Sequence, residues 1–210
     1  MRLTVASAVG ADTEVALVRV PYPPHASQPS DPFAYLIPGG WRTDPRYPFP
    51  LPWAPALAYK GAEDLAFAPN FDDTASREYH SYCFFWWLDG EMPFTADRLA
   101  DDMTAYFRGL AKERGSSGHF TPDPGKVTAR YEADAHGPRT FGGAAARSFR
   151  GQVSIYDSHG KVITLYSEVV AAFCPATNHS AAFFGMSLEP SDGDIWKPLH
   201  AIRDSFRCSR

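Results

Sequence analysis

The sequence has few cysteines, no run of basic residues and no long hydrophobic segment. Only three of its 210 residues are cysteine, and no five consecutive residues are all Lys or Arg. With 24 acidic and 20 basic residues, the net charge of -4 argues against a general nucleic-acid or anionic-membrane surface. No apolar stretch approaches the roughly 20 residues of a membrane-spanning helix, so we expect no integral membrane segment. About 70% of the unfolded surface can be buried at this length, so the core requires neither a metal nor a disulfide framework.

The common catalytic and cofactor-binding motifs are also missing. The sequence has no Gly-x-x-x-x-Gly-Lys-Ser/Thr loop, no Gly-x-Ser-x-Gly, no His-Glu-x-x-His, no Cys-x-x-Cys, and no Gly-x-Gly-x-x-Gly after a strand. The cysteines are far apart, and no two histidines have ligand spacing on a helix. We therefore expect no metal ion and no cofactor, and we favour a non-enzymatic protein.

The first segment of the chain, residues 1–20, has two interpretations. Residues 3–11 are small and weakly apolar, and Ala6-Ser7-Ala8 has the small-x-small form that a signal peptidase cleaves. The segment is then the remnant of an export signal. Alternatively, it is an ordinary N-terminus that leads into the strand-like residues 14–20.

A proline-rich segment follows, over residues 21–55. It contains most of the 19 prolines, which excludes regular helix or ladder-paired strand over most of its length. It also has seven large aromatic residues, too many for a solvated linker. We predict an extended segment that wraps one face of the following domain, the alternative being a partner-binding arm. The aromatic residues are Tyr22, Phe33, Tyr35, Trp41, Tyr47, Phe49 and Trp53.

The remaining residues, 56–210, show clear periodicity. Strand 80–88 is apolar on both faces, so it must be covered on both sides, and Gly151 indicates a bulge or bend. Consecutive strands with few helices indicate the α+β class, with one antiparallel sheet and two amphipathic helices. We predict strands at 64–68, 80–88, 126–132, 145–156, 161–173 and 179–188, and helices at 95–114 and 191–206.

This domain resembles the Mog1/PsbP-like fold. The resemblance rests on the element order and on residues that are similar to those of exported bacterial proteins of this size. It covers roughly residues 56–210 and implies a non-enzymatic accessory or binding domain. The residues that carry it are Phe85-Trp-Trp-Leu88, Tyr106-Phe-Arg-Gly-Leu110, Gly151-Gln-Val-Ser-Ile-Tyr-Asp157, Trp196 and Ser205-Phe-Arg-Cys208.

Two loops contain candidate catalytic or anion-binding residues. Residues 72–78 and His80 could hold a divalent cation, but we favour a solvated loop because the alternating calcium-loop spacing is absent. Glu78 and His80 share a face of the expected strand, which makes a proton-transfer pair conceivable. The second loop is glycine-rich; it is either a long hairpin loop or an anion site. Its candidate residues are His136, Arg139 and Arg147.

A third group is aromatic. If Trp41, Trp53, Tyr47 and Tyr59 were exposed together, they would form a stacking surface for sugar rings or for a proline-rich peptide. The alternative that we favour is packing in the core.

We expect Cys174 and Cys208 to lie close together. Cys174 ends one strand, the next strand runs about 33 Å away from it, and the final helix returns about 21 Å. A helix antiparallel to that strand would bring the chain end back, and a few extended residues can cover the difference. We predict a Cys174–Cys208 disulfide in an oxidising compartment and reduced thiols in the cytosol, with Cys83 as a buried free thiol.

The functional prediction is an exported domain, periplasmic or extracellular, with a binding or accessory role in the cell envelope. It would bind a protein or a small ligand in a groove between the sheet and the proline-rich segment; a cytoplasmic location is the alternative. The second hypothesis is a small metal-independent hydrolase. That hypothesis requires at least two of His80, His119 and His136 to converge with a carboxylate in a pocket.

Overall fold

The computed structural model describes residues 33–116 and 120–208, and the account below refers to these residues. It contains one large antiparallel sheet and two α-helices, which confirms the predicted α+β class. The elements are β1 (Phe33–Ala34), β2 (Arg42–Thr43), β3 (Tyr47–Pro48), β4 (Gly61–Phe67), β5 (Tyr82–Asp89), α1 (Ala96–Ser116), a 3-10 turn (Pro124–Lys126), β6 (Thr128–Ala133), β7 (Thr140–Phe141), β8 (Ala144–Tyr156), β9 (Val162–Cys174), β10 (His179–Ser187), α2 (Trp196–Ser205) and β11 (Arg207–Cys208).

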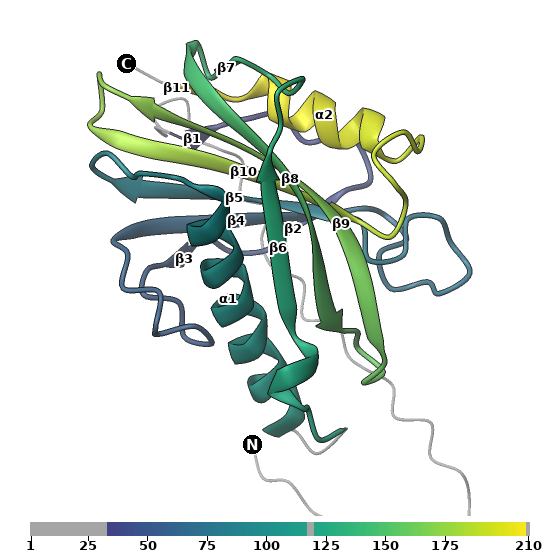
Figure 1. Cartoon of the computed structure of the whole chain (residues 1–210). Helices are drawn as coiled ribbons and strands as arrows, with labels where there is room; N and C mark the ends of the chain where they lie inside the picture. The colour runs from purple at the N-terminus through teal and green to yellow at the C-terminus, as the bar shows by residue number, and fades with distance from the viewer. Residues whose placement is uncertain (1–32, 117–119, 209–210) are drawn as a thin grey trace, which may run out of the picture.

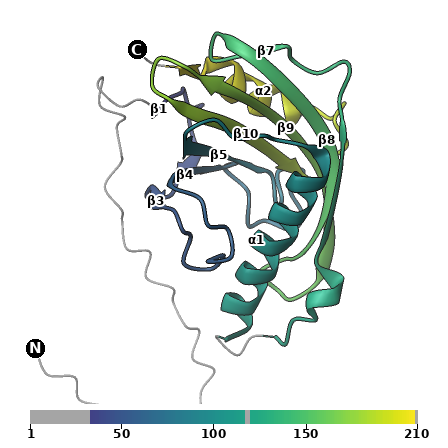
Figure 2. The ribbon, with the colours of Figure 1, turned by 60° about the vertical axis from the view of Figure 1, so that its left-hand side comes forward.

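The large sheet has the strand order β2-β4-β5-β10-β9-β8-β6, with β3 also paired to β4 and β7 to β8. Every named pair is antiparallel. Figures 1 and 2 show the sheet curving around α1, while α2 lies on its other side. A separate two-stranded sheet joins the two ends of the described chain, because β1 pairs with β11. No helix among the described residues is long and apolar enough to span a membrane.

The two helices cover opposite faces of the sheet and define two cores. β5 contributes side chains to both cores, as the apolar residues on its two faces predict. Phe84 and Trp86 point to one core, and Phe85 points to the other. The first core lies under α1 and includes Leu51, Leu65, Phe84, Trp86, Leu99, Met103, Tyr106 and Phe184. The second core lies under α2 and includes Phe85, Trp87, Phe141, Phe183, Trp196, Leu199, Ile202 and Phe206.

Helix α1 forms where the periodicity predicts it. Its buried side chains include Leu99, Met103 and Phe107, which lie along one stripe. The side chain of Thr95 accepts a hydrogen bond of 3.2 Å from the backbone N–H of Arg98, as a helix N-cap does. The other helix starts later than predicted, at Trp196 instead of near residue 191, because turns occupy the preceding residues.

The described part of the proline-rich segment, residues 33–55, lies against both cores. Tyr35 stacks on Phe85 with ring centroids 4.3 Å apart, on the α2 side. Phe49 packs edge-on against Trp86 at 5.5 Å, on the α1 side. Residues 21–32 of the segment, and the predicted export signal in residues 1–20, lie outside the described residues.

Of the bulge or bend predicted at Gly151, the bulge is absent. The register is continuous across three strands, with Gly151 opposite Tyr131 on one side and opposite Ser167 on the other. A Cβ atom at this position would overlap the carbonyl oxygen of Arg130 and the ring of Tyr131. Glycine is therefore needed here because a ring packs over the backbone.

The predicted cysteine pairing is confirmed. Cys174, at the end of β9, is at disulfide distance from Cys208 in β11, with Cα atoms 5.6 Å apart and a sequence separation of 34. Cys83 is buried and free, on the strand next to β10. Burial raises the pKa of its thiol far above the ordinary range, so we expect it to be unreactive.

Candidate functional site

A cavity of about 330 Å³ lies between the sheet, helix α1 and the proline-rich segment. We call it the α1 cavity. The sheet contributes residues of β4, β5 and β8, and the loop between β4 and β5 contributes two more. It is lined by Asp44, Tyr47, Pro52, Trp53, Leu65, Phe67, Phe71, His80, Tyr82, Tyr106, Phe107, Leu110, Glu113, Arg114 and Ile155.

The proline-rich segment reaches the cavity because α1 has a glycine at the contact. A Cβ atom at Gly109 would overlap the carbonyl oxygen of Trp53. Trp53 then packs edge-on against two tyrosines, with ring centroids 5.0 Å from Tyr47 and 5.9 Å from Tyr106. Its indole N–H faces the Tyr106 hydroxyl without reaching hydrogen-bond geometry. Aromatic rings at right angles thus form one wall of the cavity.

His80 lies in the α1 cavity on a loop that turns sharply before β5. Its backbone φ is 51°, in the left-handed region, and its N–H donates to the carbonyl oxygen of Phe71 at 3.0 Å. The imidazole packs between two rings, with centroids 4.8 Å from Phe71 and 4.6 Å from Tyr79. Only 2% of the residue is exposed, and Nδ1 has no hydrogen-bond partner. Burial lowers its pKa to about 4, with a further contribution from the Arg114 guanidinium.

A buried carboxyl group holds Tyr106 in place behind the cavity wall. Glu63 is fully buried, and its two oxygens accept hydrogen bonds from Trp86 Nε1 at 2.7 Å and from the Tyr106 hydroxyl at 3.0 Å. Burial raises the pKa of Glu63 to about 8, although both hydrogen bonds favour its charged form. The carboxyl therefore carries a proton over most of the physiological pH range.

Three charged side chains also line the cavity. Asp44 and Glu113 contribute negative charge and Arg114 positive charge. Burial raises the pKa of Asp44, while Arg42 acts in the opposite direction. The neighbouring Arg46 is held by two hydrogen bonds of 2.8 Å to the carboxylate of Asp64. The cavity is thus mainly apolar and aromatic, with charges of both signs among its lining residues.

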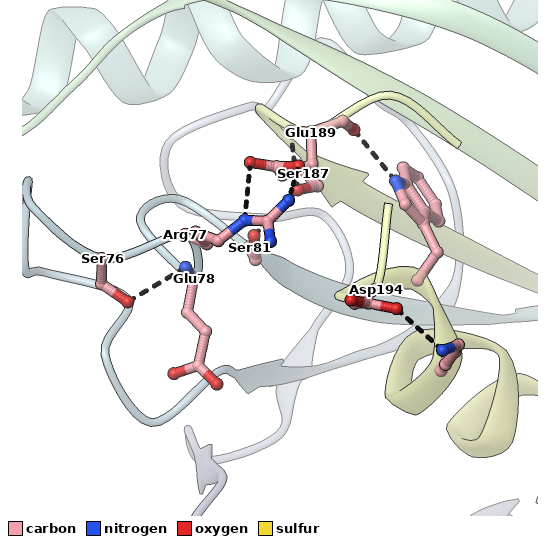
Figure 3. A network of polar contacts seen from close by, with 9 residues as sticks. Ser76, Arg77, Glu78, Ser81, Ser187, Glu189 and Asp194 are labelled. Atoms are coloured by element: carbon pink, nitrogen blue, oxygen red, sulfur yellow. Dashed lines mark hydrogen bonds and ion pairs between the residues drawn. The ribbon is translucent and has the colours of Figure 1, made fainter. Parts of the chain in front are cut away.

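Glu78 and His80 do not share a strand face, and that prediction is wrong. β5 begins only at Tyr82, and both residues belong to the turns before it. The carboxylate of Glu78 accepts from the backbone and the side chain of Asn70, at 3.0 and 2.8 Å. Figure 3 shows it pointing away from the Arg77–Glu189 ion pair, which ties this loop to the chain after β10. Glu78 therefore stabilises its own loop.

The glycine-rich loop does not gather its basic residues at one point. His136 is exposed, and its backbone N–H donates to Asp134. Arg139 donates to the carbonyl oxygen of Ala135 at 2.5 Å, within the loop. Arg147 donates to the carbonyl oxygen of Phe94 at 3.2 Å, at the start of α1. These contacts support the hairpin-loop interpretation.

The four aromatic residues pack against the cores, as the favoured interpretation predicts, and they do not form a single stacking surface. Trp41 packs against the second core, whereas Trp53, Tyr47 and Tyr59 pack against the first, on the other face of the sheet. Tyr59 donates a hydrogen bond of 2.5 Å to Asp102, and the guanidinium of Arg98 lies over its ring. Of the four, Trp53 and Tyr47 line the α1 cavity.

Within residues 33–116 and 120–208, no three His, Cys, Asp or Glu side chains are grouped closely enough to hold a metal ion. His119, one of the three histidines of the hydrolase hypothesis, lies outside the described residues. Of the other two, His80 lines the cavity and His136 does not.

The sequence analysis missed two acidic residues of this region. Glu63 directly precedes the predicted strand 64–68, so it was outside the pattern, yet it shares a strand face with Leu65. Glu113 lies outside the apolar stripe of α1, and it is exposed while still lining the cavity. Extending the alternation of β4 by one residue pair would have placed Glu63 in the core.

In comparisons with known proteins, the chain matches no family model and no curated protein.

Proposed function

We propose that this protein is a non-enzymatic exported domain that binds a small, largely apolar ligand in the α1 cavity. The observation that carries the proposal is the cavity itself, which is walled by aromatic and apolar side chains and contains a buried imidazole with an unpaired Nδ1. Small-molecule sites have this composition, in which a few polar groups orient a ligand among apolar walls. The volume lies near the lower end of the usual range of roughly 300–1,000 Å³.

Export is supported by the cysteine pair. A structural disulfide persists in an oxidising compartment and is rare in the cytosol, and Cys174 and Cys208 lie at disulfide distance. The Mog1/PsbP-like resemblance points to the same class of accessory or binding domain.

Catalysis by paired histidines has less support. His80 is the imidazole that lines the cavity, and its lowered pKa leaves it neutral at pH 7. Glu78, its predicted partner, is hydrogen-bonded to Asn70. A general-base pair needs both groups within reach of one proton, and these two residues do not provide it.

The proposal is tested with N-phenyl-1-naphthylamine, an uncharged apolar probe whose fluorescence rises when it leaves water. The full oxidised chain should bind it, and Leu110→Trp should abolish binding because the larger side chain fills the cavity. Leu36→Trp is the matched control, since Leu36 is 75% exposed and does not line the cavity. It should leave binding unchanged.

A thermal melt of each variant shows whether it folds. If Leu110→Trp does not fold, Pro52→Trp replaces it, because Pro52 is exposed and also lines the cavity. Absence of probe binding to the wild-type chain, or equal binding by the blocked and control variants, would contradict the proposed function.

A further inference from the structure

The backbone of His80 is in the left-handed region, which glycine adopts more easily than histidine. A left-handed residue with a Cβ atom costs about 1–2 kcal/mol relative to the right-handed form, whereas glycine avoids this cost. Strained positions of this kind persist where the surrounding structure enforces them and are concentrated at functional sites. The φ of 51° at His80 is one of two positive values at non-glycine residues in the described chain.

The imidazole of His80 is also unusual for a buried side chain. A buried polar atom without a hydrogen bond costs roughly 1–3 kcal/mol, and Nδ1 of His80 is such an atom. Because the ring is neutral at pH 7, one nitrogen is a donor and the other an acceptor. Phenylalanine would pack between the same rings without an unpaired nitrogen. Packing does not account for histidine here, and His80 lines the α1 cavity, so we infer that its imidazole is kept for a ligand in that cavity.

Burial beside His80 disfavours a charged ligand. Burial has the largest effect on the pKa of His80, and it lowers it. Arg114 of α1 and His159 of the β8–β9 turn lower this pKa further. Asp157 of the same turn and Asp72 of the β4–β5 loop raise it. The same burial would destabilise a charged ligand group beside the ring. The charged lining residues have both signs, so they do not compensate this burial for one sign of ligand alone: an anion would meet Asp44 and Glu113 as well as Arg114.

The walls select a flat ligand. Tyr47, Trp53 and Tyr106 present rings at near right angles, and Phe67 and Phe71 form a further edge-on pair with centroids 4.9 Å apart. Aromatic faces and edges favour another aromatic ring in offset or edge-on contact. The modest cavity volume fits a compact molecule of one to three aromatic rings better than an extended chain.

We propose that the ligand is a small uncharged aromatic molecule with one hydrogen-bonding group, and that His80 binds this group inside the α1 cavity. This inference rests on the proposed function and specifies its ligand class. His80 is then a specificity-determining residue: the aromatic walls hold the ring, and the imidazole distinguishes a ring with a hydroxyl from the bare hydrocarbon.

Four probes of similar size separate the ligand classes at pH 7: phenol, toluene, benzoate and benzylamine. Phenol should bind most tightly, and toluene roughly five- to tenfold more weakly because it forms no hydrogen bond. The two charged probes should bind more weakly than both. Leu110→Trp should remove phenol binding, which assigns the site.

The matched variants are His80→Phe and His136→Phe. The first keeps a ring at position 80 and removes both nitrogens, so the ratio of phenol affinity to toluene affinity should fall to one or below, because the phenol hydroxyl is then buried without a partner. The second changes an exposed histidine that does not line the cavity and should leave the ratio unchanged. The imidazole ¹⁵N resonances of His80 in the wild-type chain should shift on phenol binding, a result that needs no variant to fold.

The outcomes separate this inference from the proposed function. If benzoate or benzylamine binds most tightly and Leu110→Trp blocks it, the ligand class is wrong while the cavity remains a binding site. The class is equally wrong if N-phenyl-1-naphthylamine binds but phenol does not. An unchanged phenol-to-toluene ratio in His80→Phe, or unshifted His80 resonances at saturating phenol, would show that His80 does not bind the polar group. Failure of the naphthylamine probe itself would overturn both proposals.

Discussion

Glu63→Gln should make the protein more stable at neutral and alkaline pH. The Glu63 carboxyl has a pKa of about 8 in the folded chain, against an ordinary value of 4.5 when unfolded. Between these values the unfolded chain releases a proton that the folded chain keeps, so stability falls as pH rises. One pKa unit corresponds to about 1.4 kcal/mol, which gives an upper bound of about 5 kcal/mol for the whole effect above pH 8. Glutamine is neutral and can still hydrogen-bond to Trp86 and Tyr106.

The assay is urea unfolding of the wild-type chain and the variant between pH 5 and pH 9. The two free energies of unfolding should be similar near pH 5, and the advantage of Glu63→Gln should grow to a few kcal/mol by pH 8. The informative quantity is the difference in unfolding free energy between the two proteins, because the titration of His80 changes stability with pH in the opposite direction in both. Its pKa is lowered from 6.5 to about 4, so its contribution to stability is lost as pH falls through this range in both proteins.

Glu132→Gln is the matched control. Glu132 is exposed and pairs with Arg150 at 2.7 Å on the surface, so its substitution should cost no more than about 1 kcal/mol at any pH. The reasoning is refuted if Glu63→Gln is less stable than the wild type at pH 9, or if their difference does not depend on pH.

Two further predictions concern the contacts that fix the chain around the sheet. Replacing both Cys174 and Cys208 by serine should lower the free energy of unfolding by about 4 kcal/mol on the loop-entropy model for this separation. Adding a reductant to the wild type should reproduce the loss, and free alkylation of both thiols in protein purified without reductant would contradict the bond. Gly109→Ala should destabilise the protein by at least about 2 kcal/mol, measured by thermal melting, because its Cβ would overlap the carbonyl oxygen of Trp53. Gly39→Ala is the control, since no atom of the described chain beyond its two neighbours lies within 4 Å of a Cβ at that position. Equal melting temperatures of the two variants would show that the close approach of Trp53 to α1 does not matter.

The sequence predicted the parts of the fold that periodicity determines. Helix α1 follows the 3.6-residue spacing of its buried side chains, and β5 shows apolar residues on both faces because two cores meet there. The cysteine pairing followed from the expected return of the final helix along the preceding strand. Helix α2 is shorter than β10, and the residues on either side of the helix complete the return to Cys174.

The sequence could not show which face of the sheet each aromatic residue of the proline-rich segment contacts. Trp41 and Trp53 are similar in sequence context, yet they pack on opposite faces because the segment crosses the edge formed by β4. The short strands β2 and β3 were also missed, since proline argues against strands. Pro48 is tolerated in β3 because β3 pairs with a single neighbour, β4.

The candidate site was only partly predictable for a related reason. His80 was singled out beside Glu78, but the partnership assumed a strand where the chain turns, and the left-handed backbone at His80 has no signal in the local pattern. The α1 cavity lies between the sheet and the proline-rich segment, where the sequence predicts a ligand groove, and binding there stays a prediction. Its lining depends on contacts between residues far apart in sequence, such as Trp53 and Tyr106.

The most direct test of ligand binding in the α1 cavity is an NMR titration of the full oxidised chain with phenol, observed at the indole N–H groups. Trp53 lines the cavity, whereas Trp196 lies in the second core on the opposite face, with its N–H donated to the carbonyl oxygen of Glu189. Assignment by Trp53→Phe and Trp196→Phe identifies the two signals. We expect the Trp53 signal to shift progressively to saturation while the Trp196 signal stays in place; an unmoved Trp53 signal, or a shift at Trp196 alone, would contradict the account.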